Sequence, residues 1–203
     1  MSPFFIGISG GSCSGKTFFS RYLRDIIGKS ECLLVQQDSY YRDINPEETG
    51  GVLPNFDAPE AIDFEKLEQD LLGLKAGKAI DLPQYDFTTH RRLEDFVHAS
   101  PRRVIITEGM LLLGRPELRE IFDVSLYIKC SPEIRLGRRL IRDIKERGRT
   151  EESVKIQFED QVQPSHLEFV QPTQSFADIS ISQEQYLLTK DEIAHLIKSM
   201  IPS

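Results

Sequence analysis

The chain alternates between short apolar runs and longer segments in which apolar side chains recur every three or four positions. The runs VIIT and VSLYI are almost continuously apolar, which is typical of parallel strands covered on both faces. Strands are predicted at Phe4–Ser9, Cys32–Gln37, Val104–Thr107, Val124–Ile128 and Ile179–Ile181. Helices are predicted at Lys16–Ile27, Phe64–Leu74, Pro132–Lys145, Glu151–Phe169 and Lys190–Ile201. This alternation predicts a doubly wound α/β fold with a mostly parallel sheet and right-handed crossovers.

Two helix starts carry capping signals. Ser131 precedes Pro132, which places a capping side chain before a first-turn proline. Thr189 and Glu192 have the spacing of a capping box, which predicts that the last helix begins there.

One region interrupts the alternation. Residues 39–62 are rich in Asp, Glu, Pro and Gly, and residues 79–98 are typical of short strands or a hairpin. Loops of this length within a compact domain are usually functional. We therefore expect one domain over residues 1–203, with an acceptor-binding insertion at 39–98.

Composition narrows the class of protein. A chain of 203 residues suits one α/β domain, and its net charge of −7 argues against a general nucleic-acid binder. No apolar run approaches the roughly 20 residues of a membrane span, and no basic segment of a secretory signal precedes the first apolar run. The three cysteines have no metal-ligand spacing, so free thiols in a reducing cytoplasm are expected.

Residues 10–17, GGSCSGKT, fit the phosphate-loop pattern G-x-x-x-x-G-K-[ST] and stand between a predicted strand and a predicted helix. The nucleotide-binding residues would be Gly10, Gly11, Ser12, Cys13, Ser14, Gly15, Lys16 and Thr17. Backbone N–H groups would surround the β-phosphate, Lys16 would reach the β- and γ-phosphates, and the Thr17 hydroxyl would bind Mg²⁺. The alternative is a glycine-rich turn without a ligand, with Cys13 a bystander.

Two carboxylates follow predicted strands. Asp38, in QQDSYY, could accept a proton from an acceptor hydroxyl or bind a metal, and the alternative is a turn cap. Glu108, in VIITEG, matches the acidic residue that supports Mg²⁺ in phosphate-loop enzymes.

The segment RLGRRLIRDIKERGR holds six arginines between residues 135 and 149. Helical spacing predicts that Arg135, Arg138, Arg142 and Arg149 lie near one face with Lys145 among them. The predicted apolar side consists of Ile134, Leu140, Ile141 and Ile144. We expect a lid at 139–158 that closes over a triphosphate, and a solvated basic face is the alternative for about half of the arginines.

The chain lacks the N-K-x-D segment with which GTPases bind guanine, because neither Asn45 nor Asn55 is followed by Lys. It also lacks the second signature loop of transport ATPases. Of the phosphate-loop classes considered, a kinase for a small hydroxylated molecule remains.

The motifs GGSCSGKT, QQDSYY, NFDAPEAIDF, LPQYDFTTHRR, ITEGMLLL, RRLIRDIKERGR and QPTQSFADI follow one another from about Phe4 to about Ile181. In this order they resemble the uridine kinase family of phosphate-loop enzymes, the uridine/cytidine kinases. The resemblance implies transfer of the γ-phosphate of ATP or GTP, with Mg²⁺, to the 5′-hydroxyl of a pyrimidine nucleoside. It also implies a homotetramer.

The resemblance assigns roles to individual positions. Asp38 corresponds to the catalytic base and metal neighbour, and Asp57 to the carboxylate that binds the ribose 2′- and 3′-hydroxyls. The remaining nucleoside neighbours would be Tyr41, Tyr85, Phe87, His90, Arg139 and Gln157. The phosphate-facing lid residues would be Arg142, Arg147 and Arg149, of which Arg142 would take part in catalysis. Phe87 and Tyr85 have an alternative role as hairpin core, and His90 as a structural residue.

After ADI the family commonly continues with a proline-arginine-glycine turn, whereas this chain has SISQEQY. We therefore expect differences in the adenine pocket or in subunit packing. Three alternatives stay open: a related kinase for nicotinamide riboside, pantothenate or ribulose phosphate; a nucleotide-dependent regulatory module without an acceptor; and an inactive scaffold.

Overall fold

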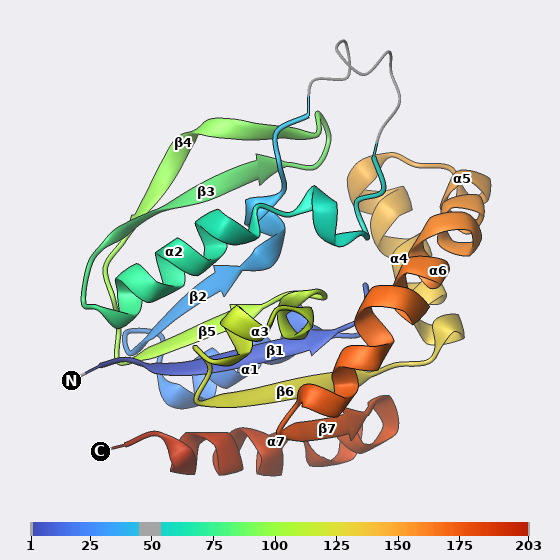
Figure 1. Ribbon diagram of the computed structural model, residues 1–203. Helices are drawn as coiled ribbons and strands as arrows, with labels where there is room; N and C mark the ends of the chain where they lie inside the picture. Colours follow the sequence, from blue (N-terminus) through green and yellow to red (C-terminus); the bar gives the residue numbers. More distant parts are fainter. Residues whose placement is uncertain (1, 45–53, 203) are drawn as a thin grey trace.

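A computed structural model describes residues 2–44 and 54–202 of the chain. Its centre is a parallel sheet in which the strands lie in the order β2-β5-β1-β6-β7 (Figure 1). The strands are β1 (Phe4–Gly10), β2 (Cys32–Gln36), β5 (Val104–Glu108), β6 (Val124–Lys129) and β7 (Ile179–Ser182). The predicted doubly wound α/β fold is confirmed.

Apolar side chains of the strands alternate between two cores. In β1, Phe5 packs on one face of the sheet, against α2 (Phe64–Lys75) and the short α3 (Pro116–Arg119). Ile6 and Ile8 pack on the opposite face, against α1 (Lys16–Ile27) and α7 (Gln183–Met200). Both faces of the sheet are covered, and this explains the continuous apolar runs.

The predicted hairpin is an antiparallel pair, β3 (Ile80–Asp86) and β4 (Arg91–Ala99), separate from the main sheet (Figure 1). Arg92 fixes it to the body of the protein. Its Nη1 donates to Asp63 Oδ2 at 3.2 Å, and its Nη2 donates to the carbonyl of Tyr41 at 3.1 Å. Of the proposed insertion at 39–98, residues 45–53 lie outside the described part of the chain.

Helix α4 (Pro132–Arg147) begins as predicted, with Ser131 Oγ accepting from the N–H of Ile134 at 3.5 Å. The next helical stretch starts as α5 (Glu151–Gln157) but is irregular beyond it. It continues as a π turn (Phe158–Val162), α6 (Gln163–Ser165), a second π turn (His166–Val170) and a 3₁₀ turn (Gln171–Phe176). The helix predicted at Glu151–Phe169 is present as a continuous helical stretch, but it is not a regular α-helix, since Pro164 has no N–H to donate and its ring would collide with the preceding turn.

The last helix does not begin at the predicted Lys190. α7 begins at Gln183, where Ser182 and Gln185 form the capping box in place of Thr189 and Glu192. The Thr189 hydroxyl instead donates to the carbonyl of Gln185 within the helix.

Helix α4 is buried on its charged side. Arg135 and Asp143 are fully buried, whereas Ile141 is 71% exposed and Ile134 and Ile144 are also exposed. The predicted apolar side is therefore wrong. The physical reason lies in the neighbours of α4: Arg135 stacks on the Phe158 ring at 5.4 Å and donates to Gln163, so the helix packs through its guanidinium groups.

α4, α5 and α6 gather at the carboxyl edge of the sheet, beyond the end of β1 (Figure 1). Across residues 2–44 and 54–202, no helix combines the length and the apolar character needed to cross a bilayer.

Candidate active site

The phosphate loop joins β1 to α1 in a conformation that needs glycine. Gly10 has a φ of 146°, and a Cβ there would lie 2.6 Å from the carbonyl oxygen of Ile128. A Cβ on Gly11 would lie 2.8 Å from Nδ1 of His166. Both glycines are required because the loop lies directly on β6 and on the second π turn.

The start of α1 leaves donors free for an anion. Gly15, with φ 103°, precedes the helix and no side chain caps it. The first-turn N–H groups of a helix have no partner within the helix, and they attract phosphate together with the helix dipole. Lys16 is buried beside them, with Nζ 3.5 Å from the carbonyl of Gly11.

Within the loop, Ser14 is fully buried and its N–H donates to the carbonyl of Gly11 at 3.0 Å. Cys13 adopts a positive φ of 62°, which is uncommon for a residue other than glycine. Ser12 faces the cavity described below.

Thr17 and Glu108 meet where α1 and β5 come together. Thr17 Oγ1 donates to Glu108 Oε1 at 2.8 Å, and Gln36 Nε2 donates to the same oxygen at 3.1 Å. Burial raises the pKa of Glu108, Lys16 opposes the rise, and the charge of Asp38 adds to it. A cation near these groups would relieve the repulsion between the two carboxylates.

The residues fit Mg²⁺. In the part of the chain that the structure describes, no three or more His, Cys, Asp or Glu side chains converge as a metal cage. Mg²⁺ usually binds through one or two carboxylates together with substrate phosphates and water, so a hydroxyl and two carboxylates beside a phosphate loop suffice.

A cavity of about 990 Å³ extends from the phosphate loop to the hairpin. Most of the predicted site residues line it: Ser12, Cys13, Gly15, Lys16, Thr17, Asp38, Tyr41, Asp57, Tyr85, Phe87, His90, Arg139, Arg142, Arg147, Arg149 and Gln157. Gly10, Gly11, Ser14 and Glu108 do not line it and lie behind its wall.

The hairpin end of the cavity is aromatic. His90, with φ 58°, stacks on Phe56 with ring centres 4.7 Å apart, and Tyr85 meets Phe87 at 5.3 Å. Burial lowers the pKa of His90, and the charge of Arg147 lowers it further. His90 is therefore neutral near pH 7 and presents one donor and one acceptor nitrogen. We had not assigned Phe56, although it stands between Asn55 and Asp57 in the motif NFD.

Asp57 is buried in the same cavity at 6% exposure. Burial raises its pKa, Arg139 opposes the rise, and the charge of Asp38 contributes to it. Its N–H donates to Asn55 Oδ1 at 3.0 Å, and Asn55 Nδ2 donates to Ser165 Oγ at 2.8 Å. Through Ser165, α6 thus holds the loop that carries Asp57 in place.

Arginines of α4 contact three different parts of the site. Arg139 donates to Ser12 Oγ and to Gln157 Oε1, each at 3.1 Å. Arg147 lies over the Phe87 ring at 4.9 Å, so the end of α4 lies close to the turn of the hairpin.

The arginine face is not the predicted one. Arg135 and Lys145 do not line the cavity, because Arg135 is buried beneath the lid and Lys145 is exposed on its outside. Arg138 lines the cavity with the others and was not among the assigned site residues. Its Nη1 donates to the carbonyls of Cys13 and Ser14 at 3.3 Å and to Gln183 Oε1 at 3.1 Å. The unusual segment SISQEQY therefore contacts the phosphate loop through Gln183.

Comparison with known proteins agrees with the family that the motifs resemble. The sequence profile of the phosphoribulokinase / uridine kinase family matches residues 5–189. A uridine kinase of Clostridium perfringens is 40% identical over 184 residues (89% of this chain, 88% of that protein), and one of Geobacillus kaustophilus is 43% identical over 183 (89% and 86%). Uridine-cytidine kinase 2-B of Danio rerio is 36% identical over 189 residues, covering 88% of this chain and 72% of that protein.

Among solved structures, phosphoribulokinase from Rhodobacter spheroides superposes with a TM-score of 0.67 at 15% identity, over 89% of this chain and 70% of that one. This likeness concerns the fold. The family predicted from the order of the motifs is confirmed: the chain belongs to the phosphoribulokinase / uridine kinase family.

Proposed function

We propose that the protein transfers the γ-phosphate of ATP or GTP to the 5′-hydroxyl of uridine, and also of cytidine, giving the nucleoside monophosphate. The observation that carries this proposal is that Asp38 and Asp57 line one cavity together with Lys16 of the phosphate loop. One carboxylate that can bind a ribose diol and one that can accept a proton thus line the same cavity as the phosphate-binding groups.

Each group has a role that its surroundings support. Asp57 accepts hydrogen bonds from the 2′- and 3′-hydroxyls, and the charge of Arg139 opposes the rise in its pKa that burial causes. Asp38 orients the 5′-hydroxyl and accepts its proton as the bond to phosphorus forms. Lys16 and the lid residues Arg142, Arg147 and Arg149 stabilise the charge on the phosphoryl oxygens.

Thr17, Asp38 and Glu108 would hold Mg²⁺. When bound, the ion would neutralise part of the charge of the nucleotide phosphates. The bond between Thr17 and Glu108 supports this role, because Glu108 accepts the hydroxyl hydrogen and leaves the oxygen lone pairs of Thr17 available to a metal.

The aromatic end of the cavity favours a flat, uncharged base. Tyr41, Phe56 and Phe87 offer ring faces or edges, and the neutral His90 can bond a polar rim. The same end disfavours ribulose phosphate, which has no ring to stack. Nicotinamide riboside shares the ribose diol, but its cationic ring would lie near Arg147.

The test is a panel of acceptors with MgATP and MgGTP, scored by chromatography of the phosphorylated product. The panel contains uridine, cytidine, thymidine, nicotinamide riboside, pantothenate and ribulose 5-phosphate, with nucleotide hydrolysis in the absence of acceptor as the control. We expect uridine and cytidine monophosphates and little hydrolysis without acceptor. Hydrolysis that is indifferent to nucleoside would instead support a regulatory module.

We also propose a homo-oligomer, the tetramer that the family resemblance implies. Three exposed apolar side chains of β4 support a protein contact at the hairpin: Leu93, Phe96 and Val97 are 41%, 56% and 50% exposed. Sedimentation analysis of the purified protein tests this, and a single monomeric species would contradict it.

A further inference from the structure

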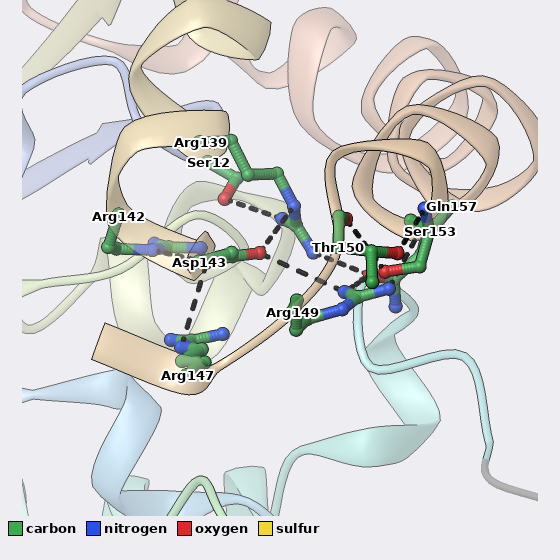
Figure 2. Close-up of polar contacts among 9 residues, drawn as sticks. All are labelled: Ser12, Arg139, Arg142, Asp143, Arg147, Arg149, Thr150, Ser153 and Gln157. Carbon is green, nitrogen blue, oxygen red and sulfur yellow. Dashed lines mark hydrogen bonds and ion pairs between the residues drawn. The ribbon is translucent and has the colours of Figure 1, made fainter. Parts of the chain in front are cut away.

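Asp143 lies in the last turns of α4, and its carboxylate is completely buried. It does not line the cavity. Figure 2 shows that four lid arginines converge on it from different sides. Each of these arginines does line the cavity: Arg139, Arg142, Arg147 and Arg149.

The contacts are close. Arg142 Nε donates to Asp143 Oδ1 at 2.8 Å. The other nitrogen–oxygen distances are 3.3 Å for Arg139 Nε, 3.7 Å for Arg147 Nε and 3.8 Å for Arg149 Nη1. Three of the four arginines thus approach through Nε, the inner nitrogen of the guanidinium group. Their outer Nη nitrogens stay available for other partners.

The outer nitrogens do contact the walls of the cavity. Arg139 uses its Nη atoms on Ser12 and Gln157, and Arg149 Nη2 donates to the carbonyl of Ser153 at 3.0 Å. Among the described residues, the Nη atoms of Arg142 donate to no protein acceptor. They are therefore available to an anion in the cavity, as are those of Arg147.

The main chain of Asp143 also takes part in ending the helix. The carbonyl of Asp143 accepts the N–H of Gly148, which ends α4 with φ 63°, and the N–H of Arg149 at 3.1 Å. These two backbone bonds close α4, and Arg147 and Arg149 lie where the helix ends.

The positive charges of the four arginines make the carboxylate of Asp143 necessary. Four positive groups around one negative group repel one another, and the pKa of Arg147 is lowered by burial and by the charge of Arg142. The contact with Arg139 is an ion pair without hydrogen-bond geometry, because Asp143 Oδ2 and Arg139 Nε have no hydrogen-bond partner. The negative charge, more than any one directional bond, holds the group together.

We propose that Asp143 is the positioning residue of the lid: one buried carboxylate sets the guanidinium groups that face the nucleoside and those that face the triphosphate. The proposal rests on the proposed function for its kinetic test. It predicts that a change at residue 143 affects nucleoside binding and phosphoryl transfer together, although this side chain touches neither substrate.

The test compares the parent protein with Asp143→Asn, which removes the charge at almost constant shape. Glu146→Gln is the matched control, since Glu146 lies on the same helix and is exposed. We expect Asp143→Asn to raise KM for uridine and lower kcat, with kcat/KM reduced about 100-fold. Glu146→Gln should stay within about twofold of the parent. Asp143→Glu, which restores the charge, should recover at least about tenfold over Asp143→Asn.

Kinetic constants of Asp143→Asn equal to those of Glu146→Gln would overturn the proposal. A folded Asp143→Glu variant whose kcat/KM does not exceed that of Asp143→Asn would also overturn it. Melting temperatures establish which variants are folded. If Asp143→Asn melts below the assay temperature, Asp143→Ser is assayed with added formate or formamide. Recovery with formate alone supports the proposal, and equal effects of the two additives contradict it.

If the parent phosphorylates no nucleoside, the proposed function has failed, and the role of Asp143 is judged by binding alone. The affinity for Mg²⁺ with a non-hydrolysable ATP analogue is then measured by calorimetry. We expect weaker binding to Asp143→Asn than to Glu146→Gln, and equal affinities would overturn the proposal.

Discussion

The hydroxyl of Thr17 donates to the carboxylate of Glu108 at 2.8 Å, across 91 positions of sequence. The bond joins the first turn of α1 to the end of β5, the two elements that meet beneath the phosphate loop. It orients the Thr17 oxygen before any nucleotide binds.

Thr17→Val removes this hydroxyl at nearly constant shape. We expect the Mg²⁺ concentration for half-maximal activity to rise at least about tenfold, because an oriented ligand oxygen is lost. Thr17→Ser keeps the hydroxyl and serves as the control. A Mg²⁺ titration of initial rates checks this, and superimposable curves for Thr17→Val and the parent would remove Thr17 from the metal site.

Asp38→Asn tests the proposed base. Turnover should fall at least about 100-fold while nucleoside affinity stays close to that of the parent, since a positioned base acts in the transition state. Asp95→Asn, on the exposed side of the hairpin, controls for the loss of one charge. Single-turnover rates and nucleoside titration separate the two effects, and near-normal turnover in Asp38→Asn would contradict the assignment.

Asp57→Asn tests recognition of the ribose diol. We expect kcat/KM for uridine to fall about 100-fold, because a charged acceptor of two hydroxyl groups is lost. Activity on 2′,3′-dideoxyuridine, which lacks both hydroxyls, should be low in the parent and change little in the variant. Equal losses on both nucleosides would mean that Asp57 acts on something other than the diol.

His166 links acid stability to the phosphate loop. Burial lowers its pKa to about 4, and the charges of Arg135 and Lys16 add to the effect. Between pH 6.5 and 4 the unfolded chain binds a proton that the folded protein excludes, so the free energy of unfolding falls as the pH falls. The loss through this window is up to about 3 kcal/mol, whereas above pH 6.5 this contribution is fully present.

Urea titrations at several pH values measure that slope. In His166→Gln we expect a smaller decrease between pH 6.5 and 4 than in the parent. His98→Gln, at an exposed position on β4, is the control and should keep the slope of the parent. Identical slopes in His166→Gln and the parent would assign the acid sensitivity to other groups.

The sheet could be predicted from sequence because strands buried on both faces leave a local signature. Phe5, Ile6 and Ile8 alternate between two cores, so nearly every position of the strand is apolar. The phosphate loop could be predicted because its glycines recur at a fixed local spacing, although the contacts that exclude a Cβ there, with Ile128 and His166, are distant in sequence.

The inner side of α4 could not be predicted, because apolar periodicity assumes a hydrocarbon neighbour. Here the neighbours of Arg135 are Phe158 and Gln163, and the neighbours of Asp143 are arginines. A carboxylate among basic residues is typical of a solvated helix, and only the folded arrangement of the four arginines around Asp143 reveals that it is buried. Sequence periodicity therefore identified the arginines without identifying what holds them.

The start of α7 was missed for a related reason. Ser182 with Gln185 and Thr189 with Glu192 both have capping-box spacing, and Leu187 and Leu188 between them are 65% and 85% exposed. These outward leucines break the amphipathic pattern of the first turns and conceal the true start.

Gln183 gives that first turn an importance beyond covering the sheet. Its side chain is buried, and its amide oxygen accepts from the same Arg138 nitrogen that bonds the carbonyls of Cys13 and Ser14. Cys13, Ser14 and Gln183 are therefore joined through Arg138 at the nucleotide cradle. A chain released from synthesis before residue 183 would have every strand of the sheet in sequence, yet it would lack the brace that steadies its own opening loop.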